Sequence, residues 1–313
     1  MKIQELTRVQ FQGVLDDKNI SAIVIRNEQA VIVTDELTTQ GNALQIFDPD
    51  GDGFHAAASG PIRLDPPGVT PKEMDLEGIA SGGDSIFIVG SHSAKRKKVD
   101  STATVAKNRE ALTSAPKAEP ARDVLLRLTL STTGTAGAID RTSLREFLDG
   151  TEPFRSFRGT ASKENGPDIE GLAVFDDHLY VGFRGPVLRG NFTPILRCRF
   201  GDPIEDPKIL FVNLGGRGVR DLAEVVEGIL ILAGPVGDGP GTYQIYRWNG
   251  KDDVPGDGSP AGPGLVLLGD IPVPDGAKAE GLAVTAESDQ HWDVLVVFDG
   301  LADDGIRYRV QKP

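Results

Sequence analysis

Residues 168–186 read DIEGLAVFDDHLYVGFRGP, which is a short apolar strand, a polar turn and a second apolar strand. Four other segments repeat this pattern, and a third strand of alternating apolar and polar residues follows each of the five. The five segments begin at Asn19, Asp75, Asp168, Gly218 and Lys278. Repetition of one small β-unit along a chain is typical of a propeller, so the predicted fold is an all-β propeller.

The number of strands favours five four-stranded blades. The fifth repeat reaches the end of the chain without a fourth strand, whereas the other repeats have one predicted near Ile62, Phe154, Ile209 and Leu265. Residues 3–13 have strand character, and pairing them beside residues 305–311 would close the last blade without leaving an open edge. Six blades stay open as an alternative, because the second repeat is longer than the others.

The chain is predicted to form one domain, residues 1–313, with an inserted loop at residues 94–122. The insertion is polar and rich in Ala, Lys and Pro, which indicates a long loop with a short helix. Another short helix is predicted at residues 143–150, where Ser143 and Glu146 have the spacing of a capping box.

Charge and cysteine content exclude several classes of protein. Lys and Arg total 33 against 46 Asp and Glu, a formal charge of −13, which disfavours binding to nucleic acid or to anionic membranes. Cys198 is the single cysteine, so an intrachain disulfide and a multi-cysteine zinc site are excluded. No secretory signal or membrane span is visible. We expect a cytoplasmic monomer with no nucleic-acid or membrane partner.

One face of the predicted propeller collects charged side chains. The second strand of each repeat returns to the face at which the first strand begins, so first-strand starts and second-strand ends share one mouth of the central channel. Carboxylates that converge there repel one another and have raised pKa values unless a cation or an arginine compensates. The candidate site residues at this mouth are Asp35, Glu77, His92, Glu170, Arg184, Arg220 and Glu280.

Oxygen ligands suit a hard cation, which leads to the hypothesis of a calcium ion held by Glu77, Glu170 and Glu280. Arg220 takes the place of a glutamate in the fourth repeat. We predict that it pairs with Glu170 or Glu280, its neighbours in blade order. Gly78, Gly171 and Gly281, which follow the three glutamates, are predicted to let the inner strands approach closely.

A hard cation beside a base and two arginines at this mouth leads to the hypothesis of a metal-assisted hydrolase of phosphoesters or esters. His92 or Asp35 is the predicted general base, and Arg184 and Arg220 are predicted to clamp a small anionic substrate. No nucleotide fingerprint and no Ser-His-Asp pattern is present to favour other enzyme classes. The alternative is a non-catalytic binding or interaction propeller whose channel acids are structural.

The repeated segments DLEGIA, DIEGLAVFDDHLYVGFRGP and KAEGLAV, together with GSHS and GVRDLAEV, resemble the bacterial DUF3616 family of uncharacterised propeller proteins over most of the chain. The same pattern is distantly similar to esterase-like phytase and SdiA-regulated propellers, and loosely similar to calcium-dependent lactonases of the gluconolactonase type. Those lactonases join one glutamate to asparagine and aspartate ligands, whereas here glutamates recur and Asn19 is the sole comparable asparagine. The resemblance implies a propeller, and the departure weighs against lactonase chemistry.

Overall fold

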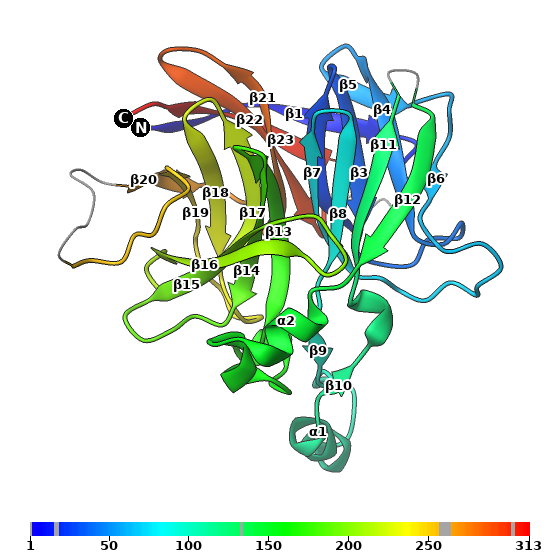
Figure 1. The fold of residues 1–313 in the computed structure, drawn as a ribbon, viewed down its shortest axis with the longest axis vertical. Helices are drawn as coiled ribbons and strands as arrows, with labels where there is room; N and C mark the ends of the chain where they lie inside the picture. The colour runs from blue at the N-terminus through cyan, green and yellow to red at the C-terminus, as the bar shows by residue number, and fades with distance from the viewer. Residues whose placement is uncertain (1, 16–18, 132–133, 257–263, 302–303) are drawn as a thin grey trace.

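The computed structural model describes residues 2–15, 19–131, 134–256, 264–301 and 304–313. The protein is all-β with propeller-like packing of its sheets (Figure 1). Three sheets have four strands each, in the order β7-β8-β11-β12, β13-β14-β15-β16 and β17-β18-β19-β20. Their strands are β7 (Leu76–Gly82), β8 (Ser85–Gly90), β11 (Leu125–Leu130), β12 (Ala136–Thr142), β13 (Asp168–Phe175), β14 (His178–Gly185), β15 (Phe192–Arg199), β16 (Glu205–Asn213), β17 (Gly218–Val225), β18 (Gly228–Gly234), β19 (Tyr243–Trp248) and β20 (Leu265–Ile271).

The two ends of the chain meet in a nine-stranded sheet, whose path is β2-β3-β4-β5-β1-β23-β22-β21 with β6 beside β4. Strand β1 pairs antiparallel with β23, from Ile3 opposite Val310 to Gln10 opposite Asp304. The predicted pairing of the N-terminal strand with the C-terminal strand is therefore confirmed, and it leaves the two termini side by side (Figure 1). The strands are β1 (Ile3–Gln12), β2 (Ile20–Arg26), β3 (Gln29–Thr34), β4 (Ala43–Asp50), β5 (Gly53–Ala56), β6 (Ile62–Arg63), β21 (Lys278–Glu287), β22 (His291–Asp299) and β23 (Asp304–Gln311).

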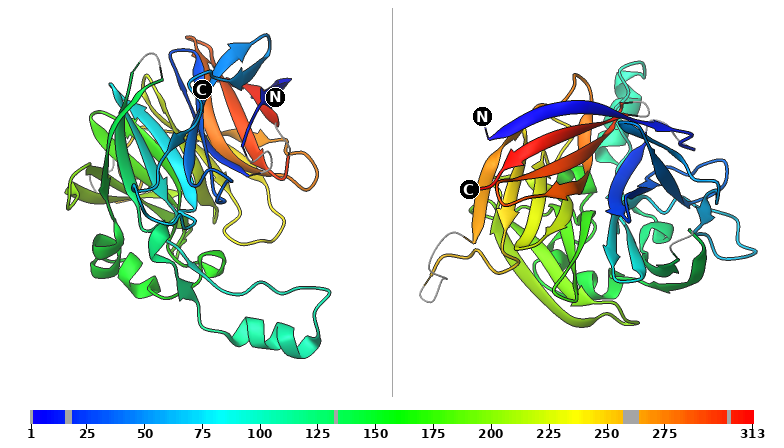
Figure 2. Two further views of the ribbon diagram at one scale, coloured as in Figure 1. Left: turned by 90° about the vertical axis from the view of Figure 1, so that its right-hand side faces the viewer. Right: turned by 90° about the horizontal axis from the view of Figure 1, so that it is seen from above.

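The first strands of the repeats, which we call the inner strands, pack in a closed circle. Strand β2 contacts β7, β7 contacts β13, β13 contacts β17, β17 contacts β21, and β21 contacts β2. The sheets are arranged around this centre (Figure 2). The apolar core lies between successive sheets. For example, Ile79 and Ile88 pack with Val31 and Leu44, and the cluster that completes the circle joins Ile23 to Leu295.

The glycines of the inner strands allow this close packing. A Cβ atom added at Gly171 would lie 2.9 Å from the Cα atom of Asp221, and one at Gly78 would lie 3.1 Å from the backbone nitrogen of Leu172. Main chain of the next inner strand therefore occupies the space of a side chain, as predicted.

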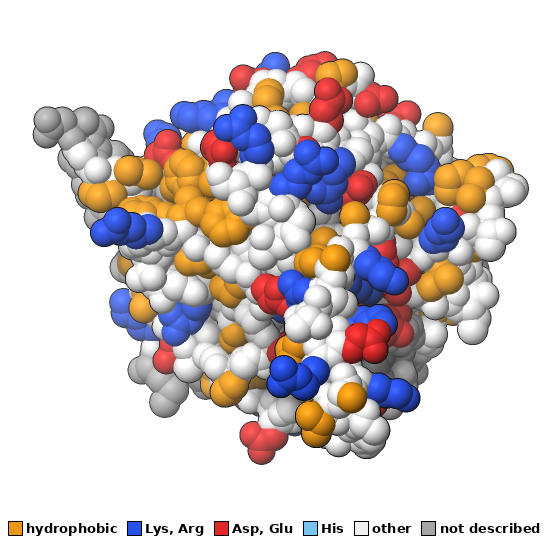
Figure 3. All heavy atoms as spheres, turned by 90° about the horizontal axis from the view of Figure 1, so that it is seen from below, with side chains coloured by type: hydrophobic (Ala, Val, Ile, Leu, Met, Phe, Trp, Pro, Cys, Tyr) orange, Lys and Arg blue, Asp and Glu red, His pale blue; other side chains and the backbone are white. Residues whose placement is uncertain are grey.

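The insertion between β8 and β11 projects from the body of the protein (Figure 2). It contains the hairpin of β9 (Ala94–Lys95) and β10 (Lys117–Ala118), the helix α1 (Val105–Thr113) and the 3-10 turn η1 (Pro120–Arg122). The predicted short helix is confirmed, and Thr104 caps it by accepting a hydrogen bond from the backbone of Lys107. Figure 3 shows this end of the molecule, where basic and acidic side chains are interspersed.

Two local predictions need correction. The fourth strand of the second repeat is β12, and not a strand near Phe154. Phe154 instead begins the 3-10 helix η2 (Phe154–Phe157), and the centroid of its ring lies 4.4 Å from that of Phe183. The helix predicted at residues 143–150 is present as α2 (Arg145–Gly150), but without the capping box. Ser143 instead accepts a hydrogen bond from the backbone of Arg145. A further 3-10 turn, η3 (Ser162–Glu164), precedes β13.

Candidate functional site

A β-bulge recurs at the same place in every inner strand. In β13, for example, Ile169 pairs with Phe183 and Gly171 with Gly182, so that Glu170 has no place in the ladder. A bulge of this kind redirects the side chain of the extra residue. The bulged residues form a layer at one end of the channel, which we call the mouth ring: Ser21, Glu77, Glu170, Arg220 and Glu280.

Arg220 joins two glutamates of the mouth ring. Its Nη1 atom lies 3.0 Å from Oε2 of Glu170, and its Nη2 atom contacts Oε1 of Glu280. All three side chains are buried. The predicted pairing of Arg220 with its neighbours in blade order is confirmed. Burial raises the pKa of Glu280 to about 7, although Arg220 opposes the shift.

Arg184, at the end of β14, adds a second guanidinium on the same side. Its Nη1 atom lies 2.8 Å from Oε1 of Glu170, and its Nη2 atom contacts Asp168. Burial raises the pKa of Asp168 to about 7, and Arg184 acts in the opposite direction. Glu170 thus lies between two arginines, so both cations predicted to clamp an anionic substrate are already paired with carboxylates.

A third arginine, Arg122, comes from the last residue of the insertion and was not predicted. It is buried and contacts Asp75 and Glu73, while its Nε atom lies 3.0 Å from Oε2 of Glu119. The sequence did carry a signal for it. A third strand runs parallel to the first, so the residues that precede β11 lie at the same mouth as the start of β7.

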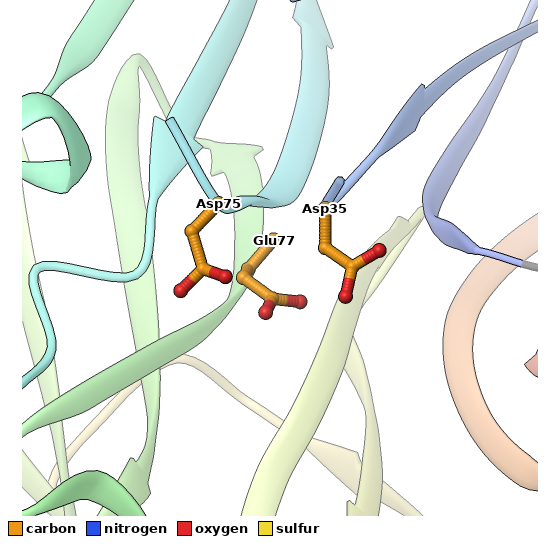
Figure 4. A group of neighbouring side chains, drawn as sticks. All are labelled: Asp35, Asp75 and Glu77. Carbon is orange, nitrogen blue, oxygen red and sulfur yellow. The ribbon is translucent and has the colours of Figure 1, made fainter. Parts of the chain in front are cut away.

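Asp35 and Glu77 lie at this mouth, and no arginine or lysine of the described residues is within ion-pair distance of either. With Asp75 they form what we call the carboxylate trio, in which one oxygen of each residue lies within 4.8 Å of the others. Glu77 lies between Asp75 and Asp35 (Figure 4). In the part of the chain that the structure describes, Oδ1 of Asp35 is shielded from water and accepts no hydrogen bond.

The pKa values of the carboxylate trio follow from this arrangement. Burial, followed by the charges of Glu280 and Asp75, raises the pKa of Asp35 to about 8. Burial and the charge of Glu170 raise the pKa of Glu77 well above its usual value. Burial also raises that of Asp75, to about 6, while Arg122 opposes the rise. Asp35 and Glu77 are therefore carboxyls of the mouth whose ionised form is disfavoured, because no arginine of the described chain offsets their burial and mutual repulsion.

The structure places His92 away from these carboxylates. Its ring is buried, its Nδ1 atom lies 2.9 Å from the carbonyl oxygen of Gly90, and its Nε2 atom accepts a hydrogen bond from the backbone of Leu144. Burial lowers its pKa to about 4. Both ring nitrogens are bonded to main chain, so we do not retain His92 as a general base. Its hydrogen bonds connect β8 to the start of α2.

Asp221 has a structural role. It follows Arg220 at the position where a glycine follows each of the three glutamates in the other strands. Its carboxylate accepts hydrogen bonds from the backbone nitrogens of Leu282 at 2.6 Å and Leu222 at 2.8 Å, and also from that of Leu172. These donors belong to three neighbouring inner strands. Asp221 therefore connects β13, β17 and β21 directly beneath Arg220.

The family model of DUF3616, described as a protein of unknown function, matches residues 19–311. The chain belongs to this family. The match confirms the resemblance seen in the repeated E-G segments and covers every inner strand. No curated protein matches the sequence.

Several solved structures are similar to this chain. A protein of unknown function from Dyadobacter fermentans aligns over 99% of this chain and 99% of its own, with 10% identity and a TM-score of 0.50. A hypothetical protein from Leishmania major aligns over 99% of this chain and 91% of its own, with 14% identity and a TM-score of 0.47. A DUF4623 protein from Bacteroides eggerthii covers 93% of this chain and 58% of its own, with 9% identity and a TM-score of 0.45. At such identities the likeness concerns the fold alone.

Among the described residues, no helix has the length and apolar character needed to cross a membrane.

Proposed function

We propose that the carboxylate trio binds a divalent cation, for which calcium is the best match, and that the protein is a metal-assisted hydrolase of phosphoesters or esters. The observation that supports this most directly is the unequal distribution of charge at the mouth. Arginines pair with Glu170, Glu280 and Asp168, whereas Asp35 and Glu77 have no cation of the described chain beside them.

The donor chemistry supports a hard cation. The trio offers carboxylate oxygens only. Calcium prefers oxygen ligands, whereas zinc and copper are usually bound by nitrogen or sulfur. A bound divalent ion would lower the raised pKa values of Asp35 and Glu77 and remove their mutual repulsion. Of the three glutamates predicted as ligands, the proposal keeps Glu77. Glu170 and Glu280 are paired with Arg220, so the proposal no longer assigns them as ligands and assigns Asp35 and Asp75 instead.

Each residue of the mouth would have a separate role in this reaction. Asp35, Asp75 and Glu77 would hold the ion, and the ion would polarise a substrate oxygen or activate a water molecule. We assign Asp35 to the ion rather than to proton transfer, because a neighbouring divalent charge would keep its carboxyl ionised at neutral pH. Arg220 would hold Glu170 and Glu280 away from the ion, so that the negative charge faces it from one side only.

The alternative is a binding propeller without catalysis, and one observation favours it. The charges of Arg220, Glu170 and Glu280 are buried at the mouth and pair with one another without a ligand. Under this alternative the mouth ring is scaffold, and partners would bind the loops between strands.

Calcium titration by calorimetry tests the proposal. Glu77→Gln and Asp35→Asn are expected to abolish binding. The matched control is Asp299→Asn, since Asp299 is a mouth carboxylate that already pairs with Lys278 at 2.5 Å. Absence of saturable binding by calcium, magnesium or manganese would overturn the proposed cation site. Phosphoester and ester substrates would then be screened with and without the ion, and activity unaffected by Glu77→Gln would refute the assignment.

We also propose that the blade number is five. The closed circle of inner strands and the apolar clusters between successive sheets support it, as does the pairing of β1 with β23 in the last blade. An experimental structure with a sixth sheet in the circle would contradict this count.

A further inference from the structure

The segment GSHS, which ends β8 and continues to Ser93, lies against the carboxylate trio. Ser91 and Ser93 are both buried. The Oγ atom of Ser91 donates a hydrogen bond to Oδ2 of Asp75. The backbone nitrogen of Ser91 also donates to the carbonyl oxygen of Asp75, at 2.9 Å. One residue at the end of β8 therefore holds both the main chain and the carboxylate of Asp75.

A chain of hydrogen bonds leads from Arg122 to the same carboxylate. Nη1 of Arg122 contacts Oδ2 of Asp75 and also donates to Oγ of Ser93 at 3.3 Å. Oγ of Ser93 lies 2.9 Å from Oγ of Ser91. A serine has a single hydroxyl proton, and that of Ser91 goes to Asp75, so Ser93 must donate its own proton to Ser91. Every donor in the chain is directed toward Asp75, which suits an ionised carboxylate.

The main chain of Asp75 has an uncommon conformation. Its φ angle is 50°, in the left-handed region that residues other than glycine adopt at a cost in free energy. Such a conformation persists where the surrounding contacts determine it, as the bonds to Ser91 and Arg122 do here. The carboxylate of Asp75 is therefore held in one direction.

The two carboxylate oxygens of Asp75 have different surroundings. Both side-chain donors reach Oδ2, and among the described residues no hydrogen bond goes to Oδ1. The carboxylate turns one oxygen toward Glu77 (Figure 4). Glu170 is different, because Arg184 and Arg220 each lie against one of its oxygens. One oxygen held by hydrogen bonds and one left for a ligand is the usual arrangement of a carboxylate that binds a metal ion.

We propose that Ser91, Ser93 and Arg122 are positioning residues of the cation site. They fix Oδ2 of Asp75, so that Oδ1 is presented to the ion beside Glu77. This inference rests on the proposed function, because it concerns a ligand of the same ion. It also gives the two serines of the GSHS segment a role that His92, bonded to the main chain of Gly90 and Leu144, does not share.

The insertion takes part in the site through Arg122, its last residue. Lys95, near its beginning, lies 2.8 Å from Glu73, and Arg122 contacts the same glutamate. Both ends of the insertion are thus held two residues from Asp75 in the sequence. A segment that the other repeats lack therefore orients a ligand of the ion, although none of its own residues binds the ion.

Calcium titration by calorimetry on the full chain tests the proposal, with thermal melts of each ion-free variant. Ser91→Ala is expected to raise the dissociation constant of calcium about tenfold, and Ser93→Ala to raise it less, because Ser93 acts through Ser91. Ser91→Thr keeps the hydroxyl group and should retain most of the affinity. The matched control is Thr193→Val, which removes a buried hydroxyl group that donates to the carbonyl oxygen of Arg217 at 2.9 Å. It should lower the melting temperature and leave the dissociation constant unchanged.

The results distinguish this inference from the proposed function. If the wild type binds calcium and Ser91→Ala binds it equally tightly, the positioning role is refuted and the cation site stands. A lower melting temperature of Ser91→Ala with an unchanged dissociation constant would show that the hydroxyl group only supports the fold. If the wild type binds no calcium, magnesium or manganese, the proposed function and this inference both fail. Ser93→Ala decides the question if Ser91→Ala does not fold.

Discussion

Nη1 of Arg220 lies 3.0 Å from Oε2 of Glu170 in the mouth ring, and both side chains are buried. Nη2 of the same guanidinium contacts Glu280, so one cation separates two glutamates that would otherwise repel each other. Removal of one partner from a buried ion pair leaves an uncompensated charge, which is far more destabilising than loss of a surface pair. Arg220 is therefore a main support of the ring.

Arg220→Ala is expected to lower the free energy of unfolding by about 3–5 kcal/mol near pH 8, and by less near pH 5. The pKa of Glu280 in the folded protein is already about 7, and it rises further without Arg220. A carboxyl whose folded-state pKa exceeds its unfolded value stabilises the fold below the unfolded pKa, and this contribution is lost as pH rises through the folded pKa. Urea unfolding at the two pH values measures the difference.

Arg127→Ala is the control, because Arg127 forms a solvent-exposed pair with Asp140 at 2.7 Å. It should change the free energy of unfolding by less than about 1 kcal/mol at either pH. Equal losses for Arg220→Ala at both pH values would show that the charge of Glu280 does not set its pH dependence.

Asp35→Asn is expected to stabilise the ion-free protein near pH 8 and to have little effect near pH 4. The folded-state pKa of Asp35 is about 8, against roughly 4 in an unfolded chain, so stability is lost as pH rises across this interval. Asparagine keeps the shape and removes the charge. Thermal melts in the presence of a chelator measure the effect, and a mutant with the pH profile of the wild type would contradict it.

Calcium is expected to raise the melting temperature of the wild type more at pH 8 than at pH 6. Protons and the ion compete for the carboxylate trio, whose pKa values are raised above their usual range. A ligand that binds the folded state alone stabilises it by mass action. Scanning calorimetry with and without calcium measures the shift, and Glu77→Gln should show none at either pH.

The repeats could be predicted because strand periodicity is a local property of a sequence, and the closing pair of strands followed from the strand count, since the last repeat lacked a fourth strand. The pairing of Arg220 followed from blade order. The bulges could not be predicted, since they depend on how one strand aligns with its partner. Without knowledge of the bulges, the sequence did not indicate that Glu170 would lie between two arginines, or that Glu77 would have none beside it.

The role of His92 shows a different limit. Its position after a second strand placed it near the mouth, but the direction of its ring is set by hydrogen bonds to Gly90 and Leu144. The direction of β11 placed Arg122 at the mouth, but its contact with Asp75 depends on the conformation of an insertion that the other repeats lack. Both cases depend on tertiary contacts of single side chains.

Gly171→Ala is expected to destabilise the protein by about 1–3 kcal/mol, because the added methyl group would meet main chain of the next inner strand. The distance from an ideal Cβ atom to the Cα atom of Asp221 is 2.9 Å. Gly150→Ala is the control, since a Cβ atom there meets nothing within 4 Å. Urea unfolding compares them, and equal stabilities would refute the role assigned to Gly171.

Arg122→Met is expected to lower the free energy of unfolding by about 3–5 kcal/mol near pH 8, since the buried carboxylate of Asp75 loses its cation. Asp75→Asn in the same chain should recover part of this loss, because the double variant has no unpaired charge at position 75. Urea unfolding of the wild type, both single variants and the double variant gives the coupling energy between the two side chains.

This cycle also separates two roles of Arg122. If its contact with Asp75 stabilises the mouth, the coupling energy is large, and limited proteolysis leaves the insertion as resistant in the double variant as in the wild type. If Arg122 acts mainly by anchoring the insertion through Glu119, 3.0 Å from its Nε atom, the insertion is cleaved equally fast in the single and double variants. We expect the first result, because Asp75 is buried whereas Glu119 is open to water, and the buried partner gives the stronger interaction.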